Sequence, residues 1–105
     1  MEDTGTVITL RADRARAGIA PRIGGSVAHY HWLDGARRHD WLRPAAPADL
    51  AAGMADRLAC FPLLPFSNRI RDGRFAFGGH AVALPLNQRA QPHALHGDGW
   101  RAAWS

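Results

Sequence analysis

The order of apolar and polar positions along the chain predicts short β-strands separated by turns. Residues 7–10 and 39–42 form strand-like runs, and residues 18–33 read as two strands joined at a bend that contains Gly24-Gly25. Runs of β-branched and aromatic side chains between glycine-containing segments are typical of strands. Asp34-Gly35 predicts a further turn, because aspartate and glycine both adopt turn conformations readily.

A different pattern between residues 44 and 59 predicts a loop with at most one short helix. Alanine dominates this segment, and Leu50, Met54 and Leu58 recur at roughly helical spacing. Pro47 suits the first turn of a helix, where the N–H that proline lacks is not needed. Gly53 is expected to interrupt the helix.

The clearest local signal is a hairpin in the last third of the chain. Residues 74–77 and 80–84 flank Gly78-Gly79. A two-residue glycine turn between strand-like runs favours a β-hairpin, because both glycines accept positive φ angles. We therefore predict an all-β fold that consists mostly of antiparallel hairpins, with one domain over residues 1–105.

Composition fits a soluble globular protein. The chain has 105 residues, of which 47% are hydrophobic and 21% charged, and no apolar stretch approaches the roughly 20 residues that a membrane-spanning helix needs. The first residues lack the basic region of a secretory signal. Cys60 is the only cysteine, which excludes an internal disulfide. These features predict a cytoplasmic protein without a membrane partner, and the apolar neighbours of Cys60 predict a buried, inert thiol.

The charge pattern does not indicate nucleic-acid binding. The formal net charge is +4, and the 13 basic residues are all arginines scattered along the chain. No run reaches the five to eight consecutive basic residues of a basic tract. A basic pI alone leaves nucleic-acid binding as a weak third hypothesis, and we expect a solvated surface and no nucleic-acid partner.

The histidines raise the question of a metal site. His29 and His31 lie two residues apart, so they share one face of a strand, while His93 and His96 form H-x-x-H in a glycine-rich loop. A zinc or iron site needs three or four converging ligands. The available carboxylates stand beside glycine in turn-like contexts: Asp34, Asp72 and Asp98. We expect no metal, and we interpret His29 and His31 as ordinary strand residues.

Polar residues emerge from an apolar segment at residues 61–75, FPLLPFSNRIRDGRF. Asn68 and Arg69 supply an amide and a planar fork of donors, and His96 adds a group that can donate or accept. Sugar hydroxyls both donate and accept, and an arginine can bridge two of them as it bridges a carboxylate. From the residues alone, an ion pair between Arg69 and Asp72 is an equal alternative.

Four consecutive motifs between residues 61 and 104 carry a family resemblance. They are P-x-x-P-F-x-N-R-I, G-x-F-x-F-x-G, L-x-x-N and H-x-L-H-G. In this order and spacing they resemble the N-terminal part of the aldose 1-epimerase (galactose mutarotase) family. The resemblance implies a large antiparallel β-sandwich, also called a supersandwich. It implies enzymes that interconvert the α and β anomers of free aldoses with neither metal nor organic cofactor.

The resemblance also implies which residues meet the sugar. By motif, Asn68, Arg69 and His96 correspond to substrate-binding positions, with a small-molecule sugar, a hexose, as the ligand. The general-acid histidine and the base glutamate of the family lie further along the chain, and the only glutamate present is Glu2. We therefore expect an N-terminal fragment that holds part of a binding site and no catalytic residue. The alternative is a non-catalytic carbohydrate-binding remnant.

Overall fold

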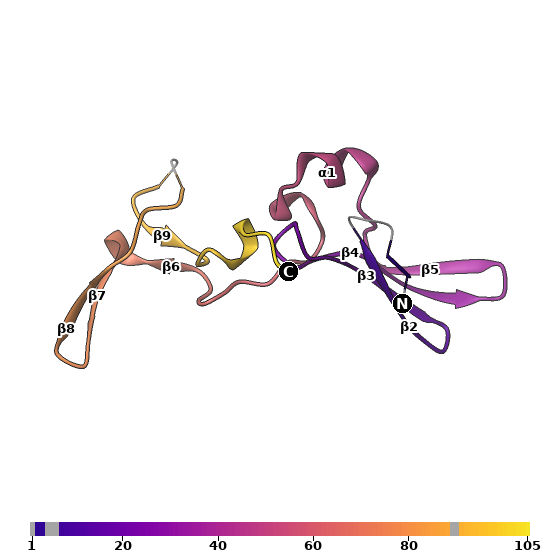
Figure 1. The fold of residues 1–105 in the computed structure, drawn as a ribbon, viewed down its shortest axis with the longest axis horizontal. Coiled ribbons are helices and arrows are strands. Elements are labelled where there is room, and N and C mark those ends of the chain that lie inside the picture. The colour runs from indigo at the N-terminus through magenta and orange to yellow at the C-terminus, as the bar shows by residue number, and fades with distance from the viewer. Residues whose placement is uncertain (1, 4–6, 89–90) are drawn as a thin grey trace. The chain divides into compact units, whose positions relative to one another are not determined.

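A computed structural model describes residues 2–3, 7–88 and 91–105 (Figure 1). The chain divides into two compact units, of which the first comprises Met1–Pro62 with Gly99–Ser105 and the second Leu63–Asp98. Antiparallel strands form the sheets of both units, and α1 (Pro47–Ala52) is the single α-helix of the described residues. The predicted all-β class is confirmed. None of the helices in the described residues is long and apolar enough to cross a membrane.

The first unit contains an antiparallel sheet in which each strand pairs with its neighbour in sequence. The strands are β1 (Glu2–Asp3), β2 (Ile8–Ala12), β3 (Ala15–Ala20), β4 (Ser26–Asp34) and β5 (Arg37–Leu42), in the order β1-β2-β3-β4-β5. The predicted bend at Gly24-Gly25 joins β3 to β4, and the predicted turn at Asp34-Gly35 leads from β4 into β5. Tight turns suffice here because antiparallel neighbours need no long crossover.

The core of the first unit lies where α1 and the C-terminal residues meet the sheet. Its buried apolar residues are Val7, Ala20, Ile23, Ala28, Ala55, Leu58 and Trp100. The Phe61 ring packs 5.8 Å from the Trp100 ring, measured between centroids. At Gly24 a Cβ would lie 2.1 Å from the Trp100 carbonyl oxygen, so this approach requires glycine. The helix ends at Gly53, which has a φ of 66°, as the sequence predicts. The 3₁₀ turns η1 (Ala55–Arg57) and η3 (Gly99–Arg101) complete the unit.

The predicted burial of Cys60 is wrong, because its side chain is exposed. Leu58 is the residue of this segment that enters the core, whereas Ala59 is exposed and Phe61 is only partly buried. The Cys60 carbonyl oxygen accepts a hydrogen bond from the Val27 N–H at 2.9 Å. The backbone of Cys60 therefore attaches to the sheet while its thiol faces outward, a distinction that apolar neighbours in the sequence do not reveal.

The second unit consists of two small antiparallel pairs. Strand β6 (Arg69–Ile70) pairs with β9 (Ala94–Leu95), and β7 (Arg74–Phe77) pairs with β8 (His80–Ala83). The β7–β8 pair is the predicted hairpin, and its turn glycines Gly78 and Gly79 have φ angles of 56° and 77°. Strand β8 ends one residue earlier than expected. The 3₁₀ turn η2 (Arg71–Gly73) leads from β6 into β7.

Candidate functional site

Pairing between β6 and β9 brings the three predicted site residues together in the second unit. Arg69 lies opposite Leu95 and Ile70 opposite Ala94. Asn68 immediately precedes β6 and His96 immediately follows β9, so the two residues meet at the same end of this short ladder. The structure thus gathers Asn68, Arg69 and His96 although 28 positions separate the first from the last.

Asn68 and His96 are joined by two hydrogen bonds, which we call the Asn68–His96 clamp. The Asn68 N–H donates to the His96 imidazole Nδ1 at 2.8 Å, and the His96 N–H donates to the Asn68 carbonyl oxygen at 2.8 Å. Both residues have positive φ, 63° for Asn68 and 59° for His96. A left-handed conformation costs an L-residue about 1–2 kcal/mol, so these hydrogen bonds hold the chain in a shape that it would otherwise avoid.

The clamp fixes the tautomer of His96. A neutral imidazole has one N–H donor and one acceptor nitrogen. Because Nδ1 accepts the Asn68 N–H, the proton of the neutral ring lies on Nε2. His96 is partly buried, and the clamp fixes the orientation of its ring.

Arg69 places its charge next to the Asn68 side chain. The Arg69 Nη1 donates to the Asn68 Oδ1 at 3.3 Å, and both residues are exposed. Among the described residues there is no ion pair between Arg69 and Asp72, the alternative that the sequence left open. The Asp72 N–H instead donates to the His93 Nδ1 at 3.0 Å, so a second histidine–backbone contact ties η2 to the start of β9.

Sequence reasoning did not assign a role to Asn87, which contacts both neighbours of His96. Its Nδ2 donates to the Leu95 and Gly97 carbonyl oxygens at 2.6 Å and 2.9 Å, and its Oδ1 accepts the Leu95 N–H at 2.8 Å. The signal for this residue is the asparagine of the L-x-x-N motif. Position 97 requires glycine, because a Cβ there would lie 2.1 Å from the Leu64 carbonyl oxygen.

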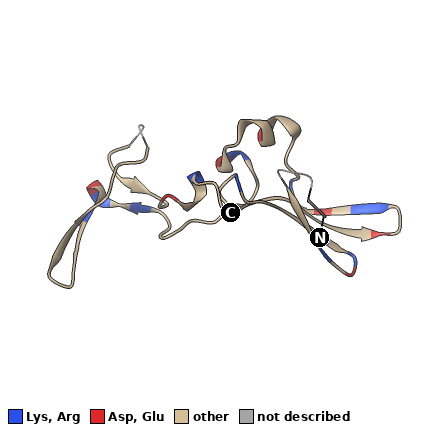
Figure 2. Ribbon diagram, viewed as in Figure 1, with Lys and Arg blue, Asp and Glu red and all other residues tan. Residues whose placement is uncertain are grey.

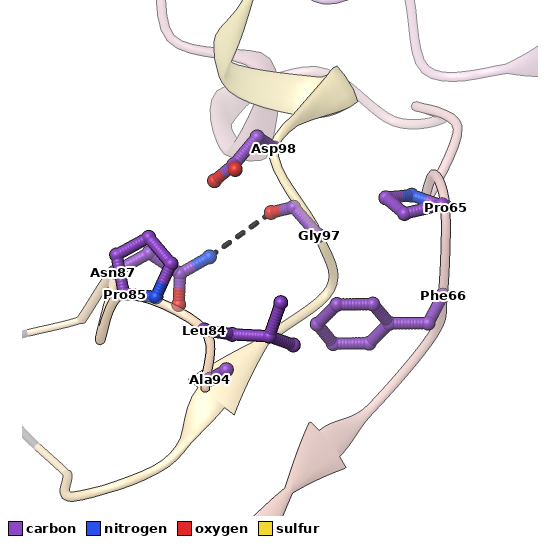
Figure 3. A pocket seen from close by; sticks show the side chains of 8 residues that line it. All are labelled: Pro65, Phe66, Leu84, Pro85, Asn87, Ala94, Gly97 and Asp98. Atoms are coloured by element: carbon purple, nitrogen blue, oxygen red, sulfur yellow. Dashed lines mark hydrogen bonds between the residues drawn. The ribbon is translucent and has the colours of Figure 1, made fainter. Parts of the chain in front are cut away.

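A small cavity lies beside the His96 loop (Figure 3). Its volume is about 70 Å³. The Phe66 ring points toward the Leu84 side chain on its apolar side, and Asn87 and Asp98 lie on its polar side.

His29 and His31 form a separate pair on the sheet of the first unit. Their rings lie 5.0 Å apart between centroids, as the predicted shared face requires. In the part of the chain that the structure describes, no group of three or more His, Cys, Asp or Glu side chains could hold a metal ion. Burial is the main cause that lowers the pKa of both imidazoles from 6.5, and Arg38 lowers both further. The pair is therefore best interpreted as a neutral packing contact.

Charged residues are spread along the described part of the chain. Arginines are dispersed over the turns and strands of the ribbon in the described residues (Figure 2). Arg38 is paired with Asp40 at 2.7 Å, and Arg14 lies 3.7 Å from Asp34. Such exposed pairs contribute little to stability.

Comparison with known proteins identifies the family of this chain. The family model described as aldose 1-epimerase matches residues 6–105, which extends the motif-bearing segment of residues 61–104 to nearly the whole chain. An uncharacterized protein of Escherichia coli K12, YphB, is 33% identical over 99 residues, an alignment that covers 94% of this chain and 31% of YphB.

Solved structures agree with that match. The crystal structure of a candidate aldose 1-epimerase from Escherichia coli K12 has a TM-score of 0.76 at 33% identity, and the match covers 94% of this chain and 31% of that one. A galactose mutarotase-like protein from Clostridium acetobutylicum has a TM-score of 0.73 at 24% identity, which supports the fold alone, with 94% of this chain and 29% of that chain covered. The chain spans about a third of the length of these relatives.

Proposed function

The chain belongs to the aldose 1-epimerase family, and on that premise we propose that Asn68, Arg69 and His96 bind the hydroxyl groups of a free hexose. The proposed activity of the whole enzyme is the interconversion of the α and β anomers of that sugar by acid/base ring opening. The 105 residues supply one side of the sugar site.

The Asn68–His96 clamp is the observation that carries this proposal. It brings the Asn68 carboxamide, the Arg69 guanidinium and the His96 imidazole together at one end of the β6–β9 pair. The carboxamide can donate and accept, while the guanidinium and Nε2–H donate. Sugar hydroxyls need both kinds of partner, and the fork of Arg69 matches two adjacent hydroxyls.

Each of these groups would act on the sugar without transferring a proton. Ring opening requires a base that removes the proton of the anomeric hydroxyl and an acid that protonates the ring oxygen. His96 Nε2–H can donate a hydrogen bond to a sugar oxygen and favour negative charge there. We assign neither proton transfer to a residue of this chain, and we propose that the 105 residues alone do not accelerate anomer exchange.

A titration followed by nuclear magnetic resonance tests the binding proposal. The isolated 105-residue chain is titrated with glucose and with galactose up to high millimolar concentration. We expect shift changes that centre on the Asn68 and Arg69 amides and the His96 ring, and we expect Arg69→Ala to remove them. Arg74→Ala is the matched control, since Arg74 is also an exposed arginine of the second unit.

Polarimetry of freshly dissolved α-glucose or α-galactose separates binding from catalysis. With the isolated chain, the optical rotation should decay at the rate of the sugar in buffer. Faster decay that depends on His96 would contradict the division of roles proposed above. Sugar-dependent shifts without faster decay fit both the enzyme part and the non-catalytic sugar-binding alternative. A lack of any shift in the unsubstituted chain would refute sugar binding by these residues.

A further inference from the structure

We propose that Asn87 is a positioning residue that sets the orientation of the His96 imidazole and thereby its readiness to bind a sugar. The second half of this statement rests on the proposed function, while the first half concerns only the geometry of the second unit. The residues involved lie on β9, on the loop that follows it and on the segment after β8.

The alternation of an antiparallel ladder explains why β9 needs Asn87. The His96 N–H bonds to the Asn68 carbonyl, so residues 68 and 96 face each other across the ladder. In such a ladder, the N–H and C=O of the neighbouring residue point to the opposite edge. Leu95 therefore directs both backbone groups away from β6, and β9 has no further strand on that edge among the described residues. Asn87 occupies the place of that strand.

The carboxamide of Asn87 reproduces the contacts that a strand would make. Its Oδ1 accepts the Leu95 N–H, and its Nδ2 donates to the Leu95 carbonyl. Its Nδ2 also donates to the Gly97 carbonyl (Figure 3). An amide has two N–H donors and one carbonyl acceptor, so one side chain fixes the residues before and after His96 together.

Contacts on both sides of His96 explain how a left-handed φ of 59° persists there. Histidine reaches this region only at a cost, and the peptide groups on both sides must be held for the conformation to be retained. Asn87 holds the peptide group before His96 through the Leu95 carbonyl and the peptide group after Gly97 through the Gly97 carbonyl. Asn68 holds the His96 N–H and Nδ1 from the other edge. Without Asn87, the loop can relax toward ordinary φ, which moves Nδ1 away from the Asn68 N–H.

The test measures the tautomer of His96 in the 105-residue chain and in three variants. Long-range ¹H–¹⁵N spectra distinguish a ring with its proton on Nε2 from a mixture of tautomers. We expect an Nε2–H ring in the unsubstituted chain and a shift toward mixed tautomers in Asn87→Ala. Asn87→Asp should behave like Asn87→Ala, because a carboxylate keeps the acceptor for Leu95 but loses both donors.

Gln91→Ala is the control for a purely structural effect. Gln91 is also a partly buried carboxamide that bonds twice to the chain before His96, through the His93 carbonyl and the His93 N–H. Its two bonds go to His93 and not to the neighbours of His96, so its removal should leave the His96 tautomer unchanged. If Gln91→Ala and Asn87→Ala change the His96 ring equally, a general loosening of the loop is the cause and the proposal is wrong.

Sugar titration of the same variants tests the functional half. We expect the dissociation constant for hexose to rise about tenfold in Asn87→Ala, as the loss of one well-placed hydrogen bond, ~1.4 kcal/mol, would cause. If the tautomer changes but the unsubstituted chain binds no sugar, the positioning role stands and the proposed function fails. If the tautomer is unchanged in Asn87→Ala, the positioning role fails whatever the sugar does.

A variant that fails to fold does not end the test. In the unsubstituted chain, both Asn87 side-chain N–H protons should exchange slowly with solvent, because each is hydrogen-bonded to a backbone carbonyl. Their exchange should accelerate together with that of the Asn68 N–H when urea is added below the unfolding transition. Fast exchange of the Asn87 protons while the Asn68 N–H stays protected would overturn the proposed link.

Discussion

Asn68 and His96 hold each other through the backbone and the side chain at once, with both N–H groups 2.8 Å from their acceptors. The two residues also share a left-handed backbone conformation. Asparagine adopts this conformation more readily than most residues do. The amide side chain of Asn68 therefore has two separate uses, one for the backbone shape and one for the contact with Arg69.

Substitution of Asn68 by glycine and by valine separates these two uses. Glycine accepts a φ of 63° without steric cost, whereas a β-branched side chain strongly disfavours it. We expect Asn68→Gly to leave the free energy of unfolding nearly unchanged and Asn68→Val to lower it by about 1–2 kcal/mol. Urea unfolding checks both values. Both variants should lose the sugar-induced shifts. Equal stability of the two variants would contradict the role of Asn68 in the backbone shape, and shifts that persist in either variant would contradict its role in sugar binding.

A second pair of substitutions tests how tightly the loop after His96 is packed. A Cβ at Gly97 would lie 2.1 Å from the Leu64 carbonyl oxygen, whereas a Cβ at Gly78 would meet nothing within 4 Å. Both glycines have positive φ, 62° and 56°. Gly78→Ala should cost only the conformational penalty of about 1–2 kcal/mol, and Gly97→Ala should cost more because backbone must move. Equal unfolding midpoints would show that the Leu64 contact is absent in solution.

The strands could be predicted from the sequence where a local pattern defines them. The turn at Asp34-Gly35 and the hairpin at Gly78-Gly79 depend on residues that favour those conformations by themselves, and both predictions are confirmed. The exposure of Cys60 could not be predicted, because it depends on which side of an extended segment faces Trp100 and the core. Apolar neighbours in the sequence do not encode that orientation.

The candidate site could be predicted in part. Asn68, Arg69 and His96 were identified by motif, and β6–β9 pairing brings them together. The structure adds the contacts between them, because a hydrogen bond between residues 28 positions apart leaves no local trace. In the sequence, Asn87 is recognisable only as the asparagine of the L-x-x-N motif, without an assigned role. Its partners are the backbone groups of Leu95 and Gly97, which have no signature in the amino-acid sequence.

Cys60 gives a direct test of the corrected prediction. Its thiol is exposed, so a thiol reagent such as 5,5′-dithiobis(2-nitrobenzoate) should react with the folded chain nearly as fast as with the chain in denaturant. Exposure controls the reactivity of a thiol together with its ionisation. Labelling that is complete only after unfolding would show that the thiol is buried in solution. Cys60→Ser serves as the blank.

The pair of histidines in the first unit predicts a dependence of stability on pH. Burial, Arg38 and, for His31, also His29 and Arg16 lower the pKa of the two rings, against the opposing effect of Asp40. The pKa in the folded state is thus below the 6.5 of the unfolded chain. Between these two values the unfolded state binds more protons, so stability falls as pH decreases. The contribution of the two neutral rings to the free energy of unfolding is complete above pH 6.5. It is lost as the pH falls through their folded-state pKa.

Urea unfolding at several pH values between about 8 and 5 checks this effect. In the described residues, neither His29 Nδ1 nor His31 Nδ1 has a hydrogen-bond partner, so a protonated ring would bury an N–H without an acceptor. His29→Gln with His31→Gln should flatten the pH dependence of the unfolding midpoint, because glutamine does not titrate. His39→Gln, an exposed histidine on β5, should leave the slope intact. A slope that survives the double substitution would assign the pH dependence to other groups.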